Sequence, residues 1–134
     1  KAFRAAGDPV VHVRHEFEPG GSIHSSVAPV DGETVFTKTE SSCFNGTEVL
    51  AHLKKLGVER LVIVGMQTHM CLEAATRAAY DLGYECTVVA DACATRDLKY
   101  GDRTVKAADV HTSTLATLNR TYATVVDTQT CLGE

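Results

Sequence analysis

The chain has 134 residues, of which 44% are hydrophobic and 22% are charged, and its formal net charge is −4. A chain of this size forms one hydrophobic core, and folding buries roughly two-thirds of the unfolded surface. Lys and Arg are scattered, which argues against nucleic-acid binding, and no apolar run approaches the roughly 20 residues needed to span a bilayer. We therefore expect a cytoplasmic protein with neither nucleic-acid nor membrane partners.

The cysteines are odd in number and form no C-x-x-C pair. This pattern favours neither a disulfide framework nor a thiolate zinc site. We expect five reduced thiols, at Cys43, Cys71, Cys86, Cys93 and Cys131.

The first residues read as the end of an amphipathic helix closed by Gly7, so we expect the sequence to begin inside a domain. Short apolar runs then predict strands at residues 10–13, 61–64, 87–90 and 123–126, with a weaker candidate at 34–37. Continuous apolar character is typical of parallel strands that are buried on both faces.

Helical spacing of apolar residues predicts helices at 47–56 and 70–82, each followed by a glycine, and a less regular helix over roughly 101–119. Residues 15–33, which include Pro19 and Gly20, have turn chemistry and predict a long loop. Strands that alternate with helices indicate an α/β fold, a three-layer α/β/α sandwich with a mainly parallel, doubly wound sheet.

The turn from the strand at 61–64 into the helix at 70–82 is the strongest candidate site, because ligands bind beyond the C-terminal ends of parallel strands. If Thr68 caps the helix, Cys71 is its third residue and lies near backbone N–H groups without intrahelical partners. Those groups favour the thiolate form of a cysteine over the thiol, so this position predicts that Cys71 is a nucleophile. The alternative is a cysteine that simply packs at the helix start.

Several segments of the chain resemble the isochorismatase-like cysteine hydrolases. They are residues 65–71 (GMQTHMC), 79–84 (AYDLGY), 91–95 (DACAT) and 35–47 (VFTKTESSCFNGT). The resemblance covers most of the chain and implies a catalytic triad of Asp, Lys and Cys. Cys71 matches the cysteine, which attacks a carbonyl carbon, and Lys38 matches the lysine, whose ammonium group favours the ionised thiol.

The resemblance also implies a cis peptide bond before Gln67, with the backbone N–H groups of Gln67 and Cys71 forming an oxyanion hole. It implies a homodimer or homotetramer as well. We expect the small-molecule substrate to contact side chains near this turn and near Lys38, namely Met66, Thr68, His69, Phe44 and His15.

The triad's aspartate has no match in the sequence. Asp8 begins a strand and Asp31 lies in the loop, so neither is a credible substitute. We therefore expect residues 1–134 to be a single isochorismatase-like domain that lacks its N-terminal strand and helix, with the aspartate preceding Lys1.

Some relatives, the nicotinamidases, carry an Asp/His metal site, for which the candidates here are His12, His15 and His24. His12 and His15 are three residues apart, so on a strand they point to opposite faces. The accompanying aspartate pattern is also missing, so we predict neither a metal nor another cofactor.

The function predicted from these residues is hydrolysis of a C–N bond in a small amide through a thioester. The amidase branch is favoured because the family's ether-cleaving members do not depend on the thiol. The alternatives are isochorismatase-type ether hydrolysis and a catalytically inactive binding module. A nucleotide-binding module is disfavoured because no G-x-G-x-x-G or P-loop pattern occurs. Substrate identity does not follow from the sequence.

Overall fold

The computed structural model describes residues 1–17 and 20–133, so Pro19 of the predicted loop lies outside the described residues. The chain forms two compact units, Lys1–Leu56 and Gly57–Glu134, and each is described by itself. Within the described ranges, no helix is long and apolar enough to cross a membrane.

The first unit is built on two parallel strands, β1 and β2, whose register pairs His15 with Lys38 at their C-terminal ends. Both strands and the helices around them were predicted from the sequence, apart from a short 3-10 turn inside the predicted loop. In chain order the elements are α1 (Ala2–Ala6), β1 (Val11–His15), η1 (Ser25–Val27), β2 (Thr34–Lys38) and α2 (Val49–Leu56).

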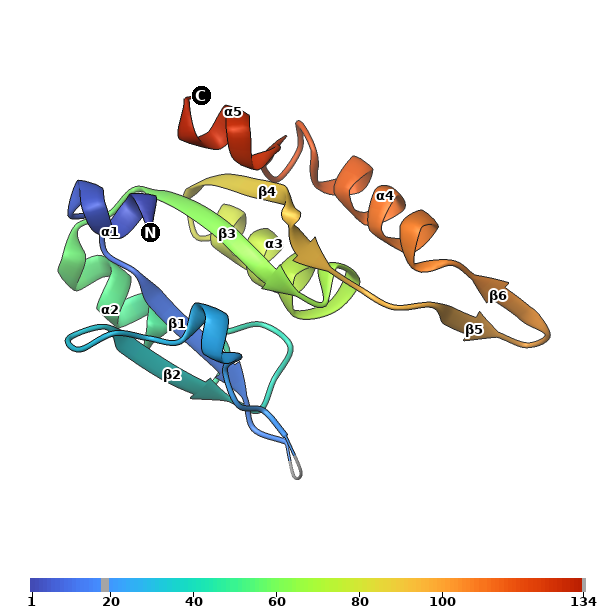
Figure 1. The fold of residues 1–134 in the computed structure, drawn as a ribbon, viewed down its shortest axis with the longest axis horizontal. Helices are drawn as coiled ribbons and strands as arrows, with labels where there is room; N and C mark the ends of the chain where they lie inside the picture. The colour runs from blue at the N-terminus through green and yellow to red at the C-terminus, as the bar shows by residue number, and fades with distance from the viewer. Residues whose placement is uncertain (18–19, 134) are drawn as a thin grey trace. The chain divides into compact units, whose positions relative to one another are not determined.

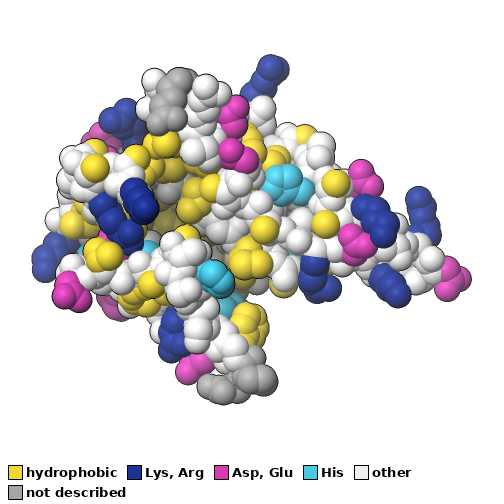
Figure 2. Space-filling model, in the orientation of Figure 1, with side chains coloured by type: hydrophobic (Ala, Val, Ile, Leu, Met, Phe, Trp, Pro, Cys, Tyr) yellow, Lys and Arg dark blue, Asp and Glu magenta, His cyan; other side chains and the backbone are white. Residues whose placement is uncertain are grey.

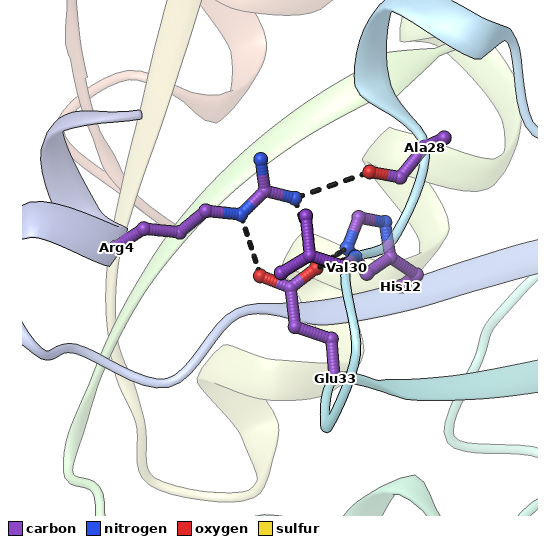
Figure 3. Close-up of polar contacts among 5 residues, drawn as sticks. All are labelled: Arg4, His12, Ala28, Val30 and Glu33. Atoms are coloured by element: carbon purple, nitrogen blue, oxygen red, sulfur yellow. Dashed lines mark hydrogen bonds and ion pairs between the residues drawn. The ribbon is translucent and has the colours of Figure 1, made fainter.

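A charged cluster fastens α1 and the long loop to β1 (Figure 3). The Arg4 guanidinium donates to both carboxylate oxygens of Glu33 at 2.6 and 2.8 Å and to the Ala28 carbonyl at 3.2 Å. Glu33 also accepts the backbone N–H of Val30 and lies 2.8 Å from the His12 ring. Arg4, followed by the Val30 amide, lowers the pKa of Glu33 to about 2.

The second unit contains a three-stranded parallel sheet in the order β3-β4-β7. Helices α3 and α5 both contact its middle strand, β4, and α4 contacts β7 (Figure 1). The elements are β3 (Arg60–Met66), η2 (Thr68–Leu72), α3 (Glu73–Asp81), β4 (Glu85–Ala94), β5 (Leu98–Tyr100), β6 (Arg103–Val105), α4 (Ala107–Leu118), β7 (Thr124–Val126) and α5 (Thr128–Leu132).

The core of this unit lies on β4 and the helices against it, with Val88 and Leu118 fully buried. Two-sided burial, predicted for every strand, is wrong for β3, because Val62, Val64 and Met66 alternate outward and are exposed. The predicted α/β class, with mainly parallel strands, is confirmed.

The predicted helix over 101–119 is wrong at its start. Residues 98–105 form an antiparallel hairpin, β5–β6, and α4 begins at Ala107. The reason is local, since Gly101 has φ 57° and, with Asp102, makes the two-residue turn that a tight hairpin requires. The hairpin extends as an arm from the sheet of this unit (Figure 1), and acidic and basic side chains gather on it (Figure 2). Helix α5 was not predicted either.

Candidate functional site

The candidate site is the elbow, defined here as residues 65–72, which connects β3 to α3. β3 ends at Met66, the Met66–Gln67 peptide bond is cis, and Thr68–Leu72 form a π-helical turn that continues into α3. This cis bond lies where the family resemblance implies one.

Thr68 was predicted to cap the helix, and this is wrong. Gln67 occupies the cap position with extended backbone, and its carbonyl accepts the N–H groups of Met70 at 3.0 Å and Leu72 at 3.4 Å. Thr68 is therefore the first helical residue, and Cys71 is the fourth rather than the third.

Cys71 nevertheless lies in the first turn of a continuous helical segment, directly after a parallel strand. The residue is half-buried. The positive end of a helix dipole and the amides of a first turn favour a thiolate over a thiol. This location suits a sulfur nucleophile.

Three consecutive elbow residues are each hydrogen-bonded by a side chain from another segment of the same unit. Gln67 Oε1 accepts from Arg96 Nε at 3.3 Å, Thr68 Oγ1 lies 2.9 Å from His111 Nδ1, and His69 Nδ1 lies 2.6 Å from Thr95 Oγ1. The elbow is therefore held from two sides, by the segment after β4 and by α4.

Lys38 ends β2 in the first unit and is only 6% exposed. Its ammonium donates to the carbonyl oxygens of Glu40 at 2.7 Å and Ser41 at 3.0 Å. It also lies 3.0 Å from Nδ1 of His15, whose ring stacks on Phe17 at 4.1 Å between centroids. A buried ammonium held in this way has a fixed direction, as a catalytic cation requires.

The predicted site residues thus fall in both units. Cys71, Gln67, Met66, Thr68 and His69 share the elbow of the second unit, and Met66 is strongly exposed. In the first unit Lys38 and His15 are in contact, and Phe44, in the same unit, is half-buried in the segment after β2. Their roles in catalysis and substrate binding stay predictions.

The candidate metal-binding histidines have separate partners. His12 contacts Glu33, His15 contacts Lys38, and the His24 ring accepts the backbone N–H of Ser26 at 3.2 Å. Across residues 1–17 and 20–133, no three His, Cys, Asp or Glu side chains are grouped so as to hold a metal ion.

Two of the remaining cysteines are held in ways that oppose ionisation. Burial raises the pKa of Cys86, and burial is also the main cause of the raised pKa of Cys93, whose thiol donates to the Val89 carbonyl at 3.1 Å. Cys43 and Cys131 are half-buried. Of the five thiols, Cys71 is the one at the start of a long helix after a strand.

Sequence reasoning missed the three residues that hold the elbow. Thr95 and Arg96 had a usable signal, because they follow a predicted strand and Ala94 pairs with Met66 across the sheet. His111 had none, since its contact with Thr68 spans 43 residues and depends on how α4 packs.

Comparisons with known proteins point to one family. The isochorismatase domain family matches residues 1–130. YddQ of Bacillus subtilis, an isochorismatase family protein, is 43% identical over 97% of this chain and 78% of its own length. A crystal structure from Oleispira antarctica, described as an isochorismatase hydrolase, is 44% identical with a TM-score of 0.94, over 99% of this chain and 76% of that one.

A third relative, the streptothricin hydrolase of Streptomyces noursei, is 35% identical over 71% of this chain and 38% of its own length. The match to the family spans both units and includes the segments that carry Lys38 and Cys71. The chain therefore belongs to the isochorismatase family of hydrolases.

Proposed function

We propose that the protein is a cysteine-dependent hydrolase that cleaves the C–N bond of a small amide, with Cys71 as the nucleophile. The observation that carries the proposal is the position of Cys71 in the first helical turn after β3. Membership of a hydrolase family supports the same chemistry.

The reaction has two steps. The Cys71 thiolate attacks the amide carbonyl carbon, the C–N bond breaks, and the nitrogen leaves as an amine after taking a proton. Water then attacks the resulting thioester, which releases the carboxylic acid and restores the thiol. The family resemblance assigns the proton transfers to an aspartate.

The negative oxygen that forms in each step needs hydrogen-bond donors aimed at it. We assign this role to the backbone N–H groups of Gln67 and Cys71, since a preorganised donor of this kind is worth about 2.7–4 kcal/mol in a transition state. The proposal is supported by the fixed elbow, in which Gln67 and Thr68 are both tied to other segments.

Lys38 is assigned as the cation that supports the thiolate and the developing charge. This assignment is supported by the burial of Lys38 and by the hydrogen bonds of its ammonium group at the C-terminal end of β2. His15, in contact with Lys38, and Phe44 are assigned to substrate binding, together with Met66 and His69 of the elbow, whereas the buried Thr68 is assigned to shaping the elbow from within. The predicted homodimer or homotetramer and the cytoplasmic location stay predictions.

Alkylation with iodoacetamide near neutral pH tests the nucleophile. Peptide mapping over time should show Cys71 labelled at least about tenfold faster than each of the other four cysteines, because the thiolate is the reactive form. The Cys131→Ser variant, which removes another half-buried thiol, should keep the fast phase, and Cys71→Ser should lose it. Slow, uniform labelling of all five would instead indicate an inactive binding module.

Lys38 is tested in the same assay. Replacing Lys38 by Met keeps the buried aliphatic stem and removes the charge, so labelling of Cys71 should slow by about tenfold or more, which corresponds to 1.4 kcal/mol of lost support for the thiolate. The matched control is Lys54→Met, which removes an exposed lysine from α2. Equal labelling rates in the two variants would remove Lys38 from the mechanism.

A further inference from the structure

We propose that His111 is a positioning residue, which holds Thr68 and through it sets the geometry of the turn that carries Cys71 and the Gln67 amide. This inference deepens the proposed function and rests on it. His111 belongs to α4, outside the elbow and outside every segment in which the sequence suggested a site.

The contact joins a buried hydroxyl to a helix that is distant in the sequence. Thr68 is 0% exposed, and its Oγ1 lies 2.9 Å from Nδ1 of His111. A buried hydroxyl without a partner is costly, so Thr68 keeps one orientation while His111 is in place. Helix α4 packs against η2, and this packing keeps His111 next to Thr68.

Thr68 is well placed to control the reacting groups. It directly follows Gln67 and lies on the same π turn as Cys71, three residues later. A π turn is a rare form of helix that is frequently found at functional sites. A tilt of Thr68 would therefore move both proposed oxyanion donors and the sulfur relative to a bound carbonyl group.

The other two elbow contacts are weaker candidates for this role. Arg96 reaches Gln67 at 3.3 Å on the exposed surface, and Thr95 reaches His69, which is partly exposed. Both come from the segment that follows β4. Of the three, the His111 contact is the one that reaches a fully buried elbow side chain.

The test uses two probes that react with the same sulfur through different transition states. p-Nitrophenyl acetate acylates a thiol: the S–C bond forms, the C–O bond breaks, nitrophenolate leaves, and a tetrahedral oxyanion forms on the way. Iodoacetamide alkylates by direct displacement of iodide and forms no oxyanion. A group that orients the oxyanion donors should therefore affect acylation much more than alkylation.

Four variants define the contact. His111→Leu keeps the approximate volume and removes the hydrogen bond, whereas His111→Asn retains a polar atom near the Nδ1 position. Thr68→Val removes the hydroxyl with little change in shape, and the fourth variant combines His111→Leu with Thr68→Val. Thr114→Val, in the same helix but bonded only to the Val110 carbonyl among the contacts described, is the matched control.

We expect acylation of Cys71 to fall by about 10- to 100-fold in His111→Leu and in Thr68→Val, because small misplacements at a reacting centre have effects of this size. His111→Asn should stay within about threefold of the wild type. The combined variant should be no slower than the slower single variant, since both changes remove one contact. Thr114→Val should react like the wild type, and alkylation should change by less than about threefold throughout.

An acylation rate within twofold of the wild type in His111→Leu would overturn the inference. It would also be overturned if the rate losses of the two single variants multiplied in the combined variant, or if acylation and alkylation slowed equally. Should His111→Leu not fold, as judged by its thermal midpoint, His111→Asn is compared with His111→Gln, in which the polar group is displaced by one methylene. Equal acylation by these two would likewise overturn it. If wild-type Cys71 reacts with neither probe, the proposed function itself fails, which is a different result.

Discussion

The substitution Leu118→Ala tests whether α4 is anchored in the core of the second unit. Leu118 is fully buried at the C-terminal end of α4, the helix that carries His111. Removing a buried leucine side chain forfeits its transfer free energy and leaves a cavity, which together cost about 2–5 kcal/mol. Because Leu118 has no exposed surface, we expect about 3 kcal/mol, which for a chain of this length lowers the thermal midpoint by about 10 °C.

The matched control is Leu132→Ala in α5, where the leucine is 39% exposed. Part of that side chain already contacts solvent, so the loss should stay below about 1 kcal/mol. Thermal and urea unfolding followed by circular dichroism measure both variants. A loss at Leu118 that is below about 1 kcal/mol, or that equals the loss at Leu132, would refute the assignment of α4 to the core.

Three further predictions concern the charged cluster, the elbow and the hairpin. The pKa of Glu33 is lowered from 4.5 to about 2 in the folded protein. The stability that this carboxylate contributes is therefore fully present above pH 4.5 and is lost as pH falls toward about 2. Acid unfolding of the Glu33→Gln variant should lack this pH dependence. Gly65 has φ 130° with open space around it, so Gly65→Ala should cost about 1–3 kcal/mol in urea unfolding through backbone strain alone. Gly101→Val should speed hydrogen exchange across 98–105 while the amides of β4 stay protected, because the turn needs a positive φ; unchanged exchange would contradict this.

The local chemistry of the sequence was sufficient to locate the parallel strands and the candidate nucleophile. Apolar runs marked β1, β2, β3, β4 and β7, since a strand in a parallel sheet needs apolar side chains whatever its neighbours are. The glycines after residues 56 and 82 marked helix ends for an equally local reason. Cys71 was singled out in the same way, by its place between a strand and a helix.

Local reasoning failed where two structures compete for the same residues. Residues 101–105 of the β5–β6 hairpin were read as the start of a helix, although Gly101-Asp102 is a recognised two-residue hairpin turn, because the surrounding threonines and charged residues carry no clear period. Thr68 was read as a helix cap because threonine commonly caps. Its hydroxyl instead meets a histidine from a distant helix, which no local rule can anticipate.

The sequence by itself determined the α/β class, the family and the identity of the sulfur nucleophile candidate, because these depend on residue types and spacings of a few positions. The tertiary structure decided which side chains hold that nucleophile's segment. Gln67, Thr68 and His69 meet partners 26 to 43 residues away. Such contacts arise only once β4 lies beside β3 and α4 packs against η2, so their physical origin is the packing of whole elements rather than the preference of any one residue.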